Sequence, residues 1–202
     1  MGNVGTSWQV LGFGAFSSHA GESDMLMRNS ANGNLELYDI TNNGYTNEVA
    51  MGNIGTSWQV LGFGAFSGHA GEDDMLMRNS ANGNIEVYDI ANSGYTNEVA
   101  MGNIGTSWQV LGIGDFSGNP GESDMLMQNS ANGAIELYDI TNNGYTNDVA
   151  MGNVGLSWRV VGFGDFSGNP GEDDMLMRNN SNGTFELYDI AHSQFTNELS
   201  IG

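Results

Sequence analysis

Carboxylate side chains recur at fixed spacing along the chain and could act as pairs in acid–base chemistry. Glu36 and Asp39 stand close together, and the pair returns at Glu86 and Asp89 and twice more after that. Paired carboxylates hydrolyse glycosides when they face each other across a cleft. Such catalysis needs one carboxyl group whose pKa differs from that of its partner. Because every copy is alike and none is unique, the sequence indicates a protein that is not an enzyme.

A second recurring set consists of aromatic, amide and cationic side chains suited to binding a small polar ligand. Aromatic rings offer flat apolar faces, and polar groups offer the hydrogen bonds that neutral sugars need. The predicted ligand-binding residues occupy four equivalent positions in each repeat: Trp8, Arg28, Asn29, Tyr38, Trp58, Arg78, Asn79, Tyr88, Trp108, Gln128, Asn129, Tyr138, Trp158, Arg178, Asn179 and Tyr188. Two other interpretations stay open: the tryptophans pack between neighbouring sheets, and the arginines form salt bridges with acids of neighbouring strands.

The three histidines do not follow the same spacing. His19 and His69 are equivalent, whereas His192 lies at another position of the repeat. We therefore expect no imidazole site that is common to the repeats.

The composition excludes several classes of partner. The 202 residues contain 4 Lys+Arg, all of them arginine, against 24 Asp+Glu, and the formal net charge is −20. This balance argues against binding to nucleic acid or to anionic membrane surfaces. No apolar run approaches about 18 residues, so we expect no membrane insertion, and no signal peptide is visible. The absence of cysteine excludes disulfides, thiol catalysis and cysteine-ligated zinc.

The candidate residues recur because the chain is a fourfold repeat of 50 residues. Residues 1–50 and 51–100 differ at seven positions. Within one repeat, apolar residues alternate over 7–16, 24–29, 34–41 and 45–51, which predicts four strands and no helix. Asn32-Gly33 and Asn43-Gly44 separate the later strands, and Asn-Gly favours a type I′ hairpin. Each repeat is therefore predicted to be a four-stranded antiparallel meander.

Several of these strands are apolar on both faces, so each sheet needs cover on both sides. The predicted fold class is all-β, a β-propeller of four blades that are each one meander. Residues 1–202 would form a single propeller domain with repeats 1–50, 51–100, 101–150 and 151–202. An open stack of sheets is the competing arrangement. Four blades is a small number for a ring, so two further arrangements stay open: a ring shared by two chains, and hence a homo-oligomer, or a fragment of a larger ring.

The motif that begins at the first strand resembles the FG-GAP/VCBS-type repeat. Ser107 to Asn119 (SWQVLGIGDFSGN) and Asp124 to Asn129 (DMLMQN) carry the resemblance, and all four repeats show it. It implies blades of a β-propeller, an extracellular or cell-surface location, and often calcium in the loop after the first strand. Some members of related propeller families are lectins.

The calcium that the resemblance implies is expected in the third and fourth repeats. The first two repeats carry Ala15 and Ala65 where the family has its leading Asp. Calcium takes about six to eight oxygen ligands. The predicted ligands are Asp115, Ser117, Asn119, Glu122 and Asp124, with Asp165, Ser167, Asn169, Glu172 and Asp174 in the last repeat. The alternative is a hydrogen-bonded turn in which Asp24 and its equivalents cap backbone N–H groups.

The leading functional hypothesis is a lectin-like, multivalent binding module that needs no cofactor. Its partner would be a glycan or another small polar ligand, because near-identical sites turn weak contacts into avidity. The alternatives are a structural or adhesive propeller segment, stabilised by calcium, and a protein–protein interaction scaffold.

Overall fold

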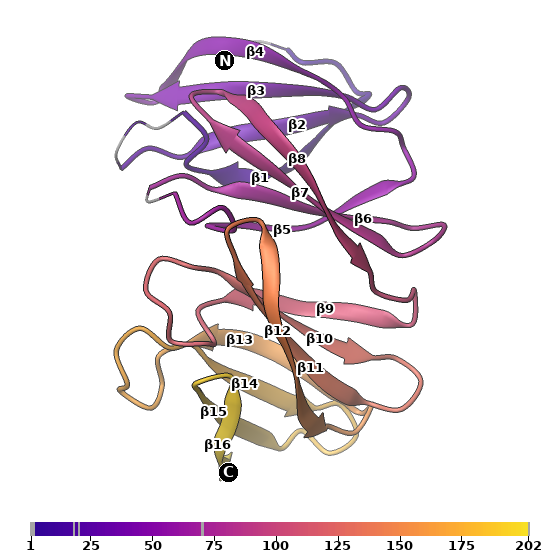
Figure 1. Ribbon diagram of the computed structural model, residues 1–202, viewed down its shortest axis with the longest axis vertical. Helices are drawn as coiled ribbons and strands as arrows, with labels where there is room; N and C mark the ends of the chain where they lie inside the picture. The colour runs from indigo at the N-terminus through magenta and orange to yellow at the C-terminus, as the bar shows by residue number, and fades with distance from the viewer. Residues whose placement is uncertain (1–2, 18, 20, 70, 202) are drawn as a thin grey trace. The chain divides into compact units, whose positions relative to one another are not determined.

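The alternating pattern of each repeat is present as β-strands. The computed structural model describes residues 3–17, 19, 21–69 and 71–201, and every regular element within these ranges is a strand. Consecutive strands pair antiparallel into four sheets, and within each sheet the strands follow the order of the sequence (Figure 1). The prediction of an all-β fold with four antiparallel meanders is confirmed. Over the same ranges, no helix has the length and apolar character needed to cross a membrane.

Each repeat contributes one sheet. The first sheet contains β1 Trp8–Gly14, β2 Asp24–Asn29, β3 Asn34–Thr41 and β4 Gly44–Asn53. The second contains β5 Trp58–Gly64, β6 Asp74–Asn79, β7 Asn84–Ala91 and β8 Gly94–Asn103. The third contains β9 Trp108–Gly114, β10 Asp124–Asn129, β11 Ala134–Thr141 and β12 Gly144–Asn153. The fourth contains β13 Trp158–Gly164, β14 Asp174–Asn179, β15 Phe185–Ala191 and β16 Gln194–Ile201.

Neither predicted Asn-Gly pair forms a two-residue type I′ turn, although Asn32 and Gly33 do lie between β2 and β3. Between β3 and β4 the turn residues are Asn42 and Asn43, with φ angles of 49° and 63°, and Thr41 pairs with Gly44. A type I′ turn needs positive φ at both central residues, and asparagine tolerates that region well. Between β2 and β3 the loop is longer, and the N–H of Gly33 donates to the Asn29 carbonyl oxygen at 2.8 Å.

The chain divides into two compact units, the first ending at Thr106 and the second beginning at Ser107. Each unit contains two sheets with a buried apolar cluster shared between them. In the first unit, Leu26 and Leu37 of one sheet share the cluster with Met75 and Met77 of the other. The second unit repeats this arrangement with Leu126, Leu137, Met175 and Met177. The burial of apolar surface between two sheets stabilises each unit.

Glycine in the first strand lets the two sheets approach closely. A Cβ atom on Gly12 would lie 2.3 Å from a ring carbon of Phe63, and one on Gly112 would lie 2.2 Å from the Phe163 ring. Phe63 and Phe163 in turn pack edge-on against Phe16 and Phe116, with ring centroids 5.2 Å apart in both pairs. The glycines of the repeat motif therefore make room for a ring of the following repeat.

Backbone hydrogen bonds join the two repeats of each unit at the loop after the first strand. In the first unit, the Ala15 N–H donates to Asp73 Oδ2 at 2.8 Å, and the Asp73 N–H donates to the Ala15 carbonyl oxygen at 3.0 Å. Asp115 and Asp173 form the same reciprocal pair in the second unit. These contacts fix the loops that carry the candidate site residues.

Candidate functional site

A buried aspartate at the start of the second strand shapes the loop before it. Asp124 is fully buried, and its Oδ2 accepts hydrogen bonds from the N–H groups of Phe116 and Ser117 at 2.9 and 2.7 Å. Its Oδ1 accepts from the Ile140 N–H at 3.2 Å. Asp24, Asp74 and Asp174 bind the loop and the third strand in the same way. The loop and the hairpin after the third strand are thereby held side by side.

A solvent-open hollow lies between this loop and this hairpin in the second and fourth repeats. In the second repeat it has a volume of about 500 Å³, and His69, Glu72, Ala91 and Asn92 are among its lining residues. In the fourth repeat it has a volume of about 380 Å³, and its lining includes the equivalent Asn169, Glu172, Ala191 and His192 together with Gly118 and Pro120 of the third repeat. We call this feature the loop hollow.

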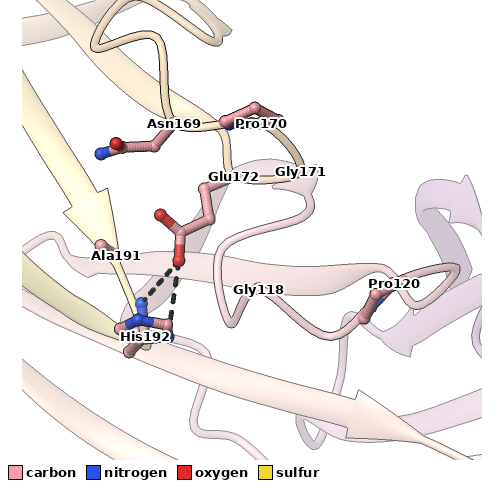
Figure 2. Close-up of a pocket in the computed structure, with 8 residues that line it drawn as sticks. All are labelled: Gly118, Pro120, Asn169, Pro170, Gly171, Glu172, Ala191 and His192. Carbon is pink, nitrogen blue, oxygen red and sulfur yellow. Dashed lines mark hydrogen bonds and ion pairs between the residues drawn. The ribbon is translucent and has the colours of Figure 1, made fainter.

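In the fourth repeat, Glu172 faces His192 across the loop hollow (Figure 2). The Glu172 Oε1 atom lies 3.5 Å from His192 Nδ1 and accepts a hydrogen bond from the His192 N–H at 3.3 Å. His192 differs in repeat position from His19 and His69, yet it approaches the same glutamate position from the hairpin. Spacing along the sequence does not reveal this proximity.

A Thr-to-Ala alternation distinguishes the odd repeats from the even ones at this place. Thr41 and Thr141 donate hydrogen bonds from their hydroxyl groups to Glu22 and Glu122. The even repeats carry Ala91 and Ala191 at this position, and alanine has no hydroxyl group. The glutamate of the odd repeats is therefore held against the hairpin by a hydroxyl group that the even repeats lack.

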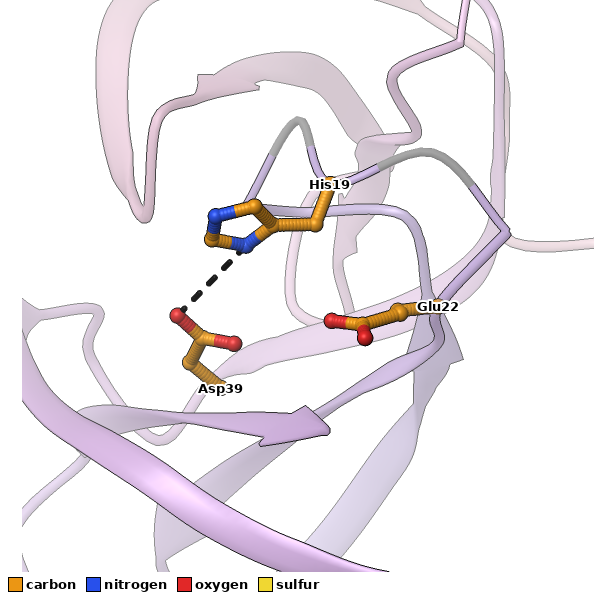
Figure 3. Close-up of side chains that lie close together, drawn as sticks. All are labelled: His19, Glu22 and Asp39. Atoms are coloured by element: carbon orange, nitrogen blue, oxygen red, sulfur yellow. Dashed lines mark ion pairs between the residues drawn. The ribbon is translucent and has the colours of Figure 1, made fainter. Parts of the chain in front are cut away.

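In the first repeat, a histidine joins the two acids at this edge of the sheet. One ligand atom from each of His19, Glu22 and Asp39 lies within 4.8 Å of the other two (Figure 3). His19 Nδ1 is 3.1 Å from Ser17 Oγ and 3.8 Å from Asp39 Oδ2. Asp39 is buried, with an exposed fraction of 5%.

No family model matches the chain, and no curated protein sequence matches it closely. In fold, the chain is similar to a chain of the Tc holotoxin pore of Photorhabdus luminescens, with a TM-score of 0.58 and 12% sequence identity. The similarity covers 92% of this chain and 10% of that one, so this chain spans about a tenth of the length of the toxin chain. At this level of identity, the match describes the fold alone.

The predicted calcium ligands of the third repeat have separate partners in the structure. Asp124 binds backbone N–H groups, Glu122 accepts from Thr141, and the Asn119 side chain hydrogen-bonds to Asp139. Asp115 Oδ1 accepts from the Gly118 N–H at 3.2 Å, and the Asn119 N–H lies 3.4 Å from Ser117 Oγ. The turn interpretation describes Asp124 as the structure has it, because its carboxylate accepts from backbone N–H groups of the loop.

The fourth repeat uses its predicted calcium ligands in a similar way. Asp165 Oδ1 accepts from the Gly168 N–H at 2.7 Å, and Ser167 Oγ lies 3.4 Å from the Asn169 N–H. Asp174 accepts from loop N–H groups, and Glu172 faces His192. Calcium in these two loops stays a prediction.

Carboxylates of neighbouring loops crowd around Asp115 in the second unit. Burial, together with the negative charges of Asp124, Asp173 and Glu172, raises the pKa of Asp115 to about 6, although the hydrogen bond from the Gly118 N–H acts to lower it. The crowding arises between two loops of adjacent repeats rather than within one loop.

The predicted ligand-binding tryptophans are half-buried at the start of the first strand of each repeat. Trp58 and Trp158 pack against the apolar clusters shared by the two sheets of their units. Trp8 and Trp108 are half-buried at the equivalent positions. This placement is the one expected if tryptophan packs between sheets.

In the first and third repeats, the residue predicted to anchor a ligand instead donates hydrogen bonds to the backbone of the following repeat. The Arg28 guanidinium donates to the carbonyl oxygens of Trp58 and Gly55, the latter at 2.7 Å, and Gln128 Nε2 donates to the Val154 carbonyl oxygen at 3.1 Å. Arg28 also lines a hollow of about 160 Å³. The Arg178 guanidinium carbon lies 5.9 Å from the centroid of the Phe185 ring, and Arg78 is half-buried on β6. Arg28 therefore binds backbone carbonyls instead of forming the salt bridge that was left open.

The predicted asparagine and tyrosine ligands are also engaged within the protein. The asparagine Oδ1 atoms accept from backbone N–H groups two residues later, at 2.8–3.0 Å, in Asn29, Asn79, Asn129 and Asn179. The hydroxyl groups of the buried tyrosines donate to glutamates at 3.0–3.2 Å, in Tyr38, Tyr88, Tyr138 and Tyr188. Burial, followed by the bond to Glu36, raises the pKa of Tyr38 to about 12.

Sequence reasoning missed the exposed aromatic residues at the start of the fourth strand. Tyr45, Tyr95 and Tyr145 are 43–44% exposed, and each contacts the buried tyrosine of the third strand edge-on. Because they recur at one position of the repeat, the sequence alone could have identified them as candidates. They are more exposed than the half-buried tryptophans.

Proposed function

We propose that the four sheets are blades of a β-propeller formed by the whole chain. Two observations support this: each sheet is a complete meander, and in both units two sheets share a core face to face. A propeller extends the same packing from pair to pair around an axis, and it leaves only short, protected edges.

We further propose that the chain is a non-catalytic, multivalent binding module that acts outside the cell, with neutral carbohydrate as its ligand class. The observation that carries this proposal is the recurrence of the loop hollow in the second and fourth repeats with four equivalent lining positions. Its carboxylate, imidazole and amide groups can accept or donate hydrogen bonds to sugar hydroxyls. The acidic surface disfavours anionic ligands. Equivalent weak sites gain affinity for a ligand that carries several copies of the same sugar.

The proposal predicts binding to neutral glycans that depends on the two glutamates of the hollow. We expect multivalent glycans on an array to bind the wild type, and the double variant Glu72→Gln, Glu172→Gln to bind at least about tenfold more weakly, since each site loses a charged acceptor. Glu98→Gln, a change at an exposed position of β8, serves as the control. The absence of binding at millimolar sugar, or equal binding by both variants, contradicts the proposal.

A second candidate function is a structural or adhesive segment stabilised by calcium. The observation that favours it is the crowding of Asp115 by the carboxylates of Asp124, Asp173 and Glu172. A divalent cation held by oxygen ligands would compensate this charge. The candidate ligands are then the four carboxylates just named, which come from two repeats of the second unit. The resemblance, by contrast, implies that all ligands of one ion lie in a single loop.

Asp115→Asn tests this candidate. The folded-state pKa of Asp115 is raised, so this group stabilises the fold at pH below 4 and that contribution is lost as the pH rises through about 6. The variant should therefore be more stable than the wild type at pH 7.5 by about 1 kcal/mol, after allowance for solvent screening, and the difference should vanish near pH 4. Thermal melting with calcium or chelator completes the test, because calcium should raise the Tm of the wild type only. An equal rise in both proteins rules out a site at Asp115.

A further inference from the structure

The edge of the first sheet holds a cluster of metal-ligating side chains that the proposed glycan site does not use. His19, Glu22 and Asp39 supply one imidazole and two carboxylates, with one ligand atom of each within 4.8 Å of the others. Among the residues that the structure describes, this is the one group of three histidine or acidic side chains with that proximity. Its members come from the loop after the first strand and from β3, which Asp24 binds together.

A buried oxygen atom of Asp39 has no hydrogen-bond partner among the residues that the structure describes, and the equivalent oxygen atoms of Asp139 and Asp189 share this property. Only 5% of the surface of Asp39 is exposed. Its Oδ2 atom faces His19, whereas its Oδ1 atom accepts no hydrogen bond from the described residues. In Figure 3 this second oxygen lies on the side of the carboxylate that is turned toward Glu22. A buried carboxylate oxygen without a donor is costly and calls for a partner. A cation between the two acids would supply it.

The donor set identifies the class of cation. Imidazole nitrogen is a ligand for zinc, copper and nickel, whereas calcium and magnesium take oxygen ligands. Zinc bonds of about 2.0–2.2 Å place neighbouring ligand atoms about 3.3–3.6 Å apart in a tetrahedron. The 3.8 Å between His19 Nδ1 and Asp39 Oδ2 is close to this spacing, and the His19 side chain is 62% exposed.

We propose that His19, Glu22 and Asp39 form a site for one divalent transition-metal ion of the zinc class, with water as the fourth ligand. The site is distinct from the loops of the third and fourth repeats, and it does not depend on glycan binding. Thr41 acts as a positioning residue, because its hydroxyl donates to Glu22 and holds that carboxylate near the hairpin.

The second and third repeats each lack one component of this site, and the fourth lacks two, because Asn169 and Ala191 replace the histidine and the threonine. In the second repeat, His69 lies 3.8 Å from Asp89, but Ala91 replaces the positioning threonine. The third repeat keeps Thr141 but has Asn119 in place of the histidine. The repeats therefore provide natural controls, and one site is expected in each chain.

Titration of the full chain with Co²⁺ tests the proposal, because visible absorption reports a four-coordinate ion and Zn²⁺ should displace it. We expect one ion per chain. His19→Asn, which copies the residue of the third repeat, should weaken binding by more than about 100-fold, since even the partners of metal ligands contribute about 10–100-fold. His69→Asn is the matched control and should leave the affinity unchanged. Circular dichroism of both variants checks that they fold.

Three outcomes overturn the site: no binding of Co²⁺, equal loss in the two histidine variants, or displacement of Co²⁺ by Ca²⁺ at equal concentration. Equal loss or no binding would leave His19 and Asp39 as an ion pair only. Ala91→Thr adds a gain-of-function test, because it supplies the missing hydroxyl and should raise the stoichiometry from one ion to two. A stoichiometry that stays at one overturns the role assigned to Thr41.

Discussion

Gly112→Ala is expected to lower the free energy of unfolding by about 2–3 kcal/mol in urea denaturation. The new methyl group would lie 2.2 Å from the Phe163 ring, closer than carbon atoms can approach. Phe163 would have to leave its position against Phe116, and the contact between the third and fourth sheets would loosen. The destabilisation would come from this steric overlap, because alanine is otherwise acceptable in a strand of this kind.

The chain contains a matched control for this substitution. Gly162 occupies the same position in the fourth repeat, and no atom lies within 4 Å of the Cβ that would be added there. Gly162→Ala should be neutral, or stabilise by about 0.4–1 kcal/mol through the unfolded chain. Equal destabilisation by both substitutions would show that glycine is needed for backbone reasons and would refute the close approach of Phe163.

Asp124→Ala is expected to be more damaging still, with a loss of about 3–5 kcal/mol in the free energy of unfolding. The substitution removes the acceptor of three backbone N–H groups, from Phe116, Ser117 and Ile140, at a site that is fully buried. Each buried donor left without a partner costs about 1–3 kcal/mol, and partial access of water reduces the sum. Urea denaturation followed by tryptophan fluorescence measures the loss.

Two further variants separate this mechanism from loss of charge. Asp124→Asn keeps one oxygen acceptor but turns an amide N–H₂ toward a backbone donor, so we expect an intermediate loss. Asp148→Ala removes a carboxylate from an exposed position of β12 and should change stability by less than about 0.5 kcal/mol. If Asp148→Ala proved as harmful as Asp124→Ala, net charge rather than the hydrogen bonds would explain the effect.

Local pattern predicted the secondary structure of this chain well. The bounds predicted for β2 and β3 agree with the structure, because alternation over 24–29 and 34–41 is uninterrupted. The turns were harder to predict, since Asn42-Asn43 and Asn43-Gly44 are both suitable for a type I′ turn and the register depends on how β3 and β4 pair. In the structure Thr41 pairs with Gly44, and this pairing fixes the register of the turn.

The candidate site was harder to predict, because repeat position does not specify what a side chain contacts. Arg28 and Asn29 were chosen as ligand-binding residues for their chemistry, yet both bind backbone groups. His192 was set apart from the other histidines by position, and the β15–β16 hairpin nevertheless brings it to Glu172. Contacts between repeats depend on tertiary structure, and alternation along a strand carries no information about them.

One signal in the sequence does report a contact between repeats. Ser23, Thr41 and Asn43 become Asp73, Ala91 and Ser93, and the same three exchanges recur between the third and fourth repeats. Asp73 and Ser93 both bind the preceding repeat, through the N–H of Ala15 and the carbonyl oxygen of Phe16. The exchanges therefore mark the face on which an even repeat meets the odd repeat before it.

This alternation makes 100 residues, rather than 50, the unit by which such a chain can lengthen or shorten without mismatch. Loss of a single even repeat would remove the aspartate that faces the loop of its odd neighbour, and two odd repeats in succession would set a serine opposite the Ala15 N–H. Loss or gain of a pair keeps every such donor with its acceptor. We therefore expect chains of this kind to differ in length by even numbers of repeats, because only then is the hydrogen bond of 2.8 Å between the Ala15 N–H and Asp73 kept in every pair.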